Sequence, residues 1–104
     1  MPHLTVRGMK LEELKVIQEE LLNGLSILLS TPVDHFTLEH ENTIFISNES
    51  YPRVQVNWFK RTEELKQTTA NLITDMIKRF NYEDVCVYFQ DLDKSNYFEN
   101  KNHF

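Results

Sequence analysis

The tetrapeptide EELK occurs twice in this chain, at residues 12–15 and again at residues 63–66. Each copy opens a segment whose apolar residues recur at helical spacing, and each follows a β-rich stretch, HLTVR at 3–7 and VQVNW at 54–58. A further β-rich stretch follows each segment, FTLEHE and then DVCVYF. A tetrapeptide of common helix formers is weak evidence by itself, but the matching order of its neighbours predicts a duplicated βαβ unit.

The two expected helices are amphipathic. We expect the first to run from about 11 to 29 and to end before Pro32, because a proline disfavours helical geometry in the residue ahead of it. The second has Thr62 as its N-cap, glutamates in its first turn, and Lys78 and Arg79 near its end, in agreement with the helix dipole. The apolar positions are Leu11, Leu14, Ile17, Leu21, Leu25 and Leu28 in the first helix and Leu65, Leu72, Met76, Ile77 and Phe80 in the second.

These elements predict an α/β (α+β) fold, in which two βαβ units form a four-stranded mixed sheet with both helices on one face. The units would be about residues 2–50 and 51–104 of a single domain, each joined by a right-handed crossover. We expect TIFIS, at 43–47, to be a further short strand.

The predicted sheet leaves one face without helices. The positions on that face include Phe59, Cys86 and Tyr88, which are not a solvated set. Burying apolar area there contributes about 25 cal/mol per Å². We therefore expect a homo-oligomer formed through the sheet.

Composition restricts the functional classes. The chain has 104 residues, 40% of them hydrophobic, and a formal net charge of −5, so a nucleic-acid or anionic-membrane surface is not expected. No N-terminal signal segment or apolar run of membrane-spanning length is present in the sequence, which favours a soluble cytoplasmic protein. The lone Cys86 is expected to be a buried structural thiol. With two glycines and no histidine pair at a metal-ligand spacing, neither a cofactor nor a metal is expected.

The C-terminal segment is rich in aromatic residues. Tyr97, Phe98 and Phe104 could line a pocket, although such residues more often dock on a neighbouring subunit. Asp91 and Asp93 have the character of turn residues.

Three stretches resemble the tautomerase superfamily, and within it the macrophage migration inhibitory factor-like proteins and an uncharacterised bacterial branch. They are MPHLTVRG at 1–8, LLSTPVDHFTLE at 28–39 and YEDVCVYFQDLDKSNYFENKNHF at 82–104. The resemblance implies a homotrimer whose three sheets wrap into a central barrel. It also implies a keto–enol isomerase whose catalytic proline begins the mature chain.

Pro2 is the residue on which that activity would depend. Removal of Met1 would convert its nitrogen into a secondary amine, and the resemblance implies that this amine takes a proton from a carbon next to a carbonyl group and returns it elsewhere. An α-amino group has a pKa of about 8 and is mostly protonated at neutral pH. An apolar pocket would lower that pKa and make the amine a better base.

The other family positions differ. Thr31 stands where the resemblance has a lysine, the second-strand arginine falls near Thr37, and the tyrosine and asparagine of the last long strand fall at Cys86 and Tyr88. A dicarboxylate substrate is therefore not expected. The remaining candidates for substrate binding are Arg7, Arg53, Lys60, Arg61 and Tyr88, of which Arg7 and Arg61 stand at strand ends.

Two hypotheses remain open at this stage. The first is an isomerase that uses Pro2 as a general base on a small carbonyl or enol compound. The second is a non-catalytic trimer of the same fold that binds a small ligand or a protein. Loss of the lysine and the second-strand arginine favours the second, whereas Pro2 with an arginine nearby favours the first.

Overall fold

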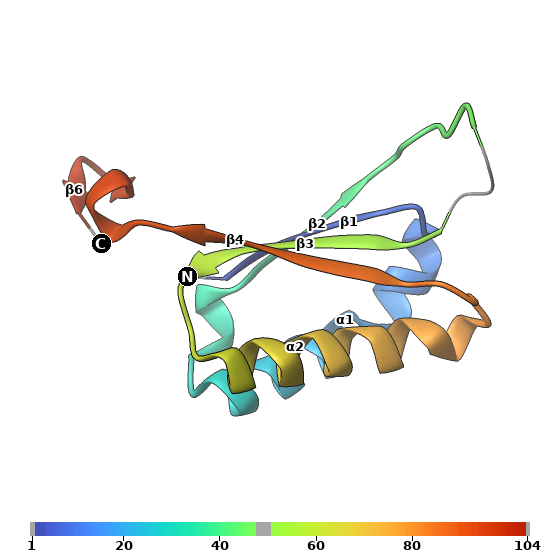
Figure 1. Ribbon diagram of the computed structural model, residues 1–104, viewed down its shortest axis with the longest axis horizontal. Coiled ribbons are helices and arrows are strands. Elements are labelled where there is room, and N and C mark those ends of the chain that lie inside the picture. Colours follow the sequence, from blue (N-terminus) through green and yellow to red (C-terminus); the bar gives the residue numbers. More distant parts are fainter. Residues whose placement is uncertain (1, 48–50, 104) are drawn as a thin grey trace.

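A computed structural model describes residues 2–47 and 51–103, arranged as a four-stranded sheet with two helices on one face (Figure 1). The main elements are β1 (His3–Arg7), α1 (Leu11–Leu29), β2 (Thr37–Glu41), β3 (Arg53–Phe59), α2 (Glu63–Ile77) and β4 (Cys86–Leu92). The short ones are η1 (Val33–His35), η2 (Lys78–Phe80), η3 (Lys94–Asn96), β5 (Phe98–Glu99) and β6 (Asn102–His103).

The strand order is β2-β1-β3-β4, as two βαβ units require. β1 pairs with β2 in parallel and β3 pairs with β4 in parallel, while the central β1–β3 pair is antiparallel. The predicted fold class is therefore confirmed.

The two units correspond in space with one change from the expected alignment. Leu4 and Val6 of β1 and Val54 and Val56 of β3 all face the helices, so HLTVR corresponds to RVQVN and not to VQVNW. Because strand side chains alternate between faces, a shift of one residue would have turned every side chain of β3 to the wrong side. The EELK match itself does place both copies at a helix start.

The helix boundaries follow the local chemistry. The first helix has the expected bounds and is followed by Ser30 in a left-handed conformation, with φ of 49°. Thr62 is the N-cap of α2, where its hydroxyl accepts a hydrogen bond from the Leu65 N–H at 3.2 Å. The apolar pattern that reaches Phe80 continues beyond α2 as the 3₁₀ turn η2.

The core lies between the helices and the sheet. Trp58 is fully buried there; its ring stacks on Phe89 with centroids 4.7 Å apart, and its Nε1–H donates to Asp91 Oδ1 at 3.0 Å. Asp91 is consequently a residue of β4, so its assignment to a turn was wrong, whereas Asp93 does cap η3. The helices contribute Leu14, Ile17, Leu21, Leu25, Leu29, Ile73, Met76 and Ile77.

The sheet face without helices, called the open face below, is more polar than expected. Phe59, Cys86 and Tyr88 do lie on it, and Cys86 is half-buried there and not in the core. Their neighbours on the same face are mostly polar: Thr5, Arg7, Thr37, Glu39, Glu41, Arg53, Gln55, Asn57 and Gln90. These polar neighbours make the open face more polar than Phe59, Cys86 and Tyr88 alone suggest.

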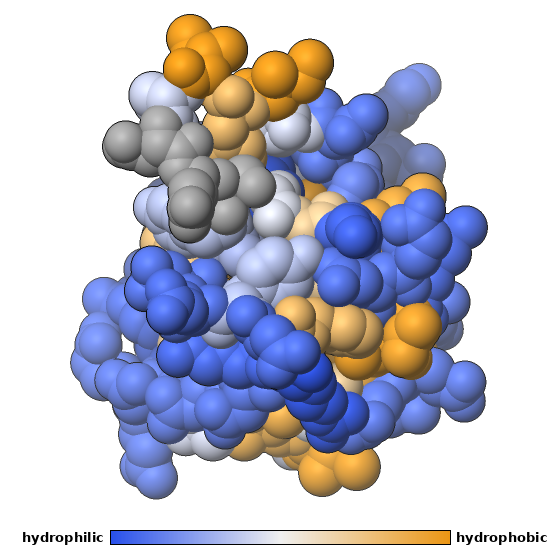
Figure 2. Space-filling model, turned by 90° about the vertical axis from the view of Figure 1, so that its right-hand side faces the viewer, coloured by the Kyte–Doolittle hydropathy of each residue, from blue (hydrophilic) through white to orange (hydrophobic). Residues whose placement is uncertain are grey.

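The expected strand at 43–47 is also absent. Its residues 43–45 have no regular structure, residues 46 and 47 form a bend, and residues 48–50 lie outside the described residues. Ile44 and Ile46 are almost fully exposed. Figure 2 views the molecule from the right-hand side of Figure 1 and shows apolar side chains at the upper edge of that surface, with further apolar patches lower down among hydrophilic residues.

None of the helices in the described ranges is both long enough and apolar enough to cross a lipid bilayer.

Candidate functional site

Pro2 lies at the head of β1 and is fully buried. Its carbonyl oxygen accepts a hydrogen bond from the Thr37 N–H at 3.2 Å, which starts the β1–β2 pairing. His3 is opposite Asn57 in the antiparallel register with β3, and continuing this register by one residue places Pro2 beside Trp58. The start of the chain therefore lies where β3 and β4 end, at the same end of the sheet as the C-terminal segment (Figure 1).

Lys60 and Arg61, two of the candidate cations, follow β3 at this end, and Arg61 makes contacts there. Its guanidinium carbon is 6.0 Å from the centroid of the Trp58 ring. Its nitrogens donate to the Leu29 carbonyl oxygen at 3.5 Å and to Thr31 Oγ1 at 3.4 Å. Part of its role is thus to stabilise the C-terminal carbonyls of α1. Arg61 and Thr31 nevertheless bring a positive charge and a hydroxyl group to the end where Pro2 lies.

A cluster around His3 occupies the open face at the same end. The Nδ1 atom of His3 is 2.6 Å from Thr37 Oγ1, and its Nε2 atom is 2.9 Å from the Tyr97 hydroxyl oxygen. The His3 and Tyr97 rings are stacked, with centroids 6.1 Å apart. The Phe59 and Tyr97 rings pack edge to face, with centroids 5.4 Å apart. Tyr97 of the C-terminal segment therefore contacts its own chain.

Several groups act on the pKa of His3. Burial lowers it from the ordinary value, and the positive amino terminus lowers it further, while Glu39 and Glu99 oppose these effects. The imidazole is consequently neutral at pH 7. Sequence reasoning missed this cluster, because no local pattern links residue 3 to residue 97.

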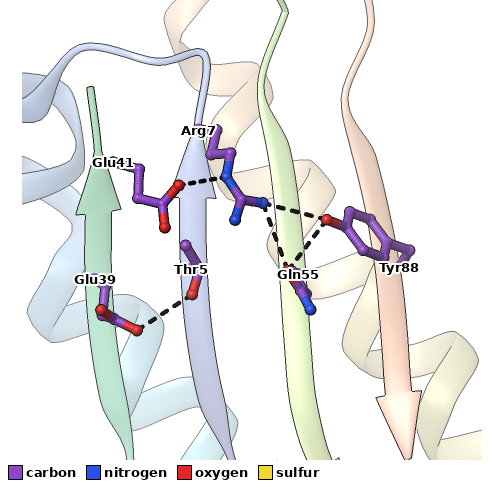
Figure 3. Close-up of polar contacts among 6 residues, drawn as sticks. All are labelled: Thr5, Arg7, Glu39, Glu41, Gln55 and Tyr88. Atoms are coloured by element: carbon purple, nitrogen blue, oxygen red, sulfur yellow. Dashed lines mark hydrogen bonds and ion pairs between the residues drawn. The ribbon is translucent and has the colours of Figure 1, made fainter. Parts of the chain in front are cut away.

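Two predicted residues, Arg7 and Tyr88, come together on the open face (Figure 3). The Arg7 Nε–H donates to Glu41 Oε2 at 2.6 Å, and its terminal nitrogen donates to the Tyr88 hydroxyl at 3.2 Å and to Gln55 Oε1 at 3.5 Å. The hydrogen bond to Glu41 is the main cause that raises the pKa of Arg7 above its ordinary value. Arg53 lies opposite Arg7 in the β1–β3 register.

This cluster is separate from Pro2 within one chain. Five residues of extended strand from Pro2 to Arg7 span about 16 Å. The predicted site residues therefore divide into two sets, with Pro2 and Arg61 at one end of the sheet and Arg7, Arg53 and Tyr88 at the other.

A cavity of about 590 Å³ lies beyond the Arg7 end of β1, and no predicted site residue lines it. His40 Nε2 is 2.6 Å from the Met9 carbonyl oxygen, and the Tyr82 hydroxyl donates to Glu13 Oε1 at 2.5 Å. The lining residues are Gly8, Met9, Lys10, Leu11, Glu12, His40, Asn42 and Tyr82. In the described part of the chain, no group of three or more His, Cys, Asp or Glu side chains is placed to hold a metal ion.

Comparison with known proteins identifies relatives of unknown function. The family model described as a domain of unknown function, DUF1904, matches residues 1–103. A DUF1904 protein from Sebaldella termitidis is 30% identical, with a TM-score of 0.90 over all of both chains. A protein of unknown function from Vibrio cholerae is 35% identical, with a TM-score of 0.93 over 99% of this chain and 87% of that one. No curated protein matches the sequence.

More distant structures share the fold alone. A macrophage migration inhibitory factor-like protein from Entamoeba histolytica is 12% identical, with a TM-score of 0.77 over 99% of this chain and 98% of that chain. Fused 4-OT, described as an asymmetric trimer, is also 12% identical, with a TM-score of 0.82 over 97% and 94%. Both are tautomerase superfamily members, so the predicted resemblance is confirmed at the level of the fold.

Proposed function

The chain belongs to the DUF1904 family and has the tautomerase fold, and on this premise we propose that it is a keto–enol tautomerase that uses the Pro2 amine as its general base. The observation that carries the proposal is the position of Pro2, fully buried at the head of β1, at the end of the sheet that also carries Arg61 and Thr31. Its substrate would be a small carbonyl compound with an acidic hydrogen on the adjacent carbon.

The proposed chemistry requires a neutral amine. After loss of Met1, the Pro2 amine would start from a pKa of about 8, and burial would lower that value. The amine then takes the proton from the carbon beside the carbonyl group. The C–H electron pair forms the new double bond, the carbonyl π pair moves to oxygen, and Pro2 returns the same proton to that oxygen. Arg61 would attract an anionic group of the substrate.

We further propose that the working form is a cytoplasmic homotrimer. Fused 4-OT supports this by its shared fold and its description as a trimer. A polar open face suits an assembly with a hydrated centre better than a dry interface.

One observation favours the alternative, a non-catalytic trimer that binds a small ligand or a protein. Pro52 precedes β3 as Pro2 precedes β1, and the Cys86 N–H donates to its carbonyl oxygen at 3.0 Å, as the Thr37 N–H does to Pro2. Both prolines are fully buried. A proline at the head of a βαβ unit therefore has a structural use that needs no free amine.

The same pair of prolines provides the test. Intact mass first establishes that the purified chain begins at Pro2. Ketonisation of phenylenolpyruvate is then measured for the wild type, Pro2→Gly and Pro52→Gly. We expect Pro2→Gly to lower kcat by about 100-fold, within the usual contribution of a general base, while Pro52→Gly changes kcat less than about threefold. No activity above buffer, or equal losses in both variants, would leave the binding protein as the remaining function.

A further inference from the structure

The Tyr97 hydroxyl lies at the same end of the sheet as Pro2, and nothing described so far assigns it a role. We propose that Tyr97 is a second functional group of the Pro2 site, which donates a hydrogen bond to the carbonyl oxygen of the substrate, and that His3 is its positioning residue. The inference rests on the proposed tautomerase function.

The position of Tyr97 is fixed from two sides. Its ring meets Phe59 with centroids 5.4 Å apart, and Phe59 is the last residue of β3, next to Trp58. On the other side, its ring stacks on His3, and its hydroxyl oxygen is 2.9 Å from His3 Nε2. His3 directly follows Pro2 in β1. The phenol is thus tied to the residue next to the proposed base.

The direction of each hydrogen bond in the cluster determines whether the Tyr97 hydroxyl acts as a donor to the substrate. Thr37 Oγ1, 2.6 Å from His3 Nδ1, donates its proton to that nitrogen in the arrangement we propose. Neutral His3 then carries its single proton on Nε2 and donates it to the Tyr97 oxygen. Accepting a hydrogen bond at its oxygen makes the phenol a stronger donor through its own O–H.

The charges that face His3 are compatible with this neutral form. Burial is the largest effect and lowers the pKa of its imidazole, and a positive amino terminus lowers it further, a contribution that the neutral Pro2 amine of the working form would not make. The carboxylates of Glu39 on β2 and Glu99 on β5 raise the pKa. Burial is the largest of these effects, so the neutral imidazole is the form that the proposed arrangement uses at pH 7.

The chemical role follows from where charge develops. When Pro2 takes the proton from carbon, negative charge develops on the carbonyl oxygen, where the Tyr97 O–H would donate a hydrogen bond. Tyr97 keeps its own proton, and Pro2 delivers the abstracted one to the oxygen, so the isomerisation balances. Removing one such donor typically lowers kcat by about 100-fold to 1,000-fold.

The first experiment compares two conservative tyrosine variants in the enol ketonisation assay. Tyr97→Phe should lower kcat by at least about 30-fold, with KM changed less than about threefold, because a donor to developing charge acts in the transition state. Tyr82→Phe is the matched control at the opposite end of the sheet and should keep the wild-type kcat. A Tyr97→Phe protein with wild-type kcat would overturn the inference.

Variants of His3 test whether this residue positions the Tyr97 hydroxyl. His3→Gln keeps an N–H donor near Nε2 and should retain most of the activity, whereas His3→Leu should lose about as much as Tyr97→Phe. The double variant Tyr97→Phe/His3→Leu should be no worse than either single variant, because the two residues act through one hydrogen bond. Additive losses would contradict a positioning role.

A measurement independent of turnover is the ¹⁵N NMR spectrum of the His3 ring at pH 7. We expect a protonated Nε2 and an unprotonated Nδ1, and the opposite tautomer would overturn the inference even if the variants fold poorly. Activity that depends on Pro2 but not on Tyr97 would refute this inference alone. Absence of wild-type activity, or activity unchanged in Pro2→Gly, would refute the proposed function and this inference with it.

Discussion

Tyr82 shows how burial and one carboxylate displace the ionisation of a single residue. Burial, the hydrogen bond to Glu13 and the Glu13 charge raise the pKa of Tyr82 to about 12, above the ordinary value of 10.0. As the pH rises, the unfolded chain releases this proton before the folded chain does. The contribution is therefore fully present below about pH 10, and the free energy of unfolding falls as the pH rises toward about 12.

Tyr82→Phe isolates this effect from the other groups that titrate at high pH. We expect urea unfolding to show a larger loss of stability between about pH 9 and pH 11 for the wild type than for the variant. Equal losses in the two proteins would mean that Tyr82 ionises at its ordinary pKa in the folded chain.

For single residues, the sequence indicated candidate site residues but not their hydrogen-bond partners. Arg7 and Tyr88 could be named as candidates, and they do form a hydrogen bond. Their distance from Pro2 within one chain depends on strand direction and register. The His3–Tyr97 contact is harder still, because it depends on where a C-terminal segment without strong periodicity returns to the sheet.

At the scale of elements, periodicity predicted the helices and failed for one strand. The bounds of α1 and the N-cap of α2 agree with the sequence, because capping and a 3.6-residue repeat are local properties. Alternation at 43–47 resembles a strand, but Ile44 and Ile46 are exposed by 86% and 98% and pair with no strand in the described residues. A β-strand requires a second strand to pair with, and a local sequence pattern does not show whether one is available.

The turn after β1 gives a prediction about element connections. Gly8 has φ of 80°, and an added Cβ would lie 2.2 Å from the Tyr51 carbonyl oxygen, a backbone atom that has little freedom to move. Gly8→Ala should therefore lower the free energy of unfolding by about 1–3 kcal/mol, measured by urea denaturation. Gly24→Ala in α1 is the control.

The control differs because Gly24 is helical and an added Cβ meets only the flexible end of Leu72, at 3.2 Å. We expect Gly24→Ala to change stability by less than about 1 kcal/mol in either direction. Similar losses in the two variants would show that the left-handed turn at Gly8 carries no special strain.

At the scale of the whole molecule, the proposed trimer would form around the open face. Strand alternation in the sequence already places Arg7 and Gln55 on this face, but their hydrogen bonds with Tyr88 arise only when β1, β3 and β4 are side by side. We expect light scattering at micromolar concentration to give the mass of three 12.4 kDa chains. A stable monomer would exclude the proposed trimer.

The salt dependence of dissociation provides a second test of the proposed trimer. Since charged and polar side chains cover the open face, added salt should weaken the trimer more than it weakens the fold of each chain. The comparison requires dissociation followed by light scattering and helix content followed by circular dichroism across one salt series. A trimer that strengthens with salt would indicate an apolar interface elsewhere on the molecule.

The central claim is that the free amine of Pro2 is the catalytic base. The most direct measurement is the phenylenolpyruvate ketonisation rate of the chain that begins at Pro2, compared with the same chain carrying one alanine ahead of Pro2, after both are shown to have the same oligomeric mass. We predict that the added residue, which turns the amine into an amide without basicity, lowers kcat by at least about 100-fold. Equal rates in the two proteins would contradict the claim.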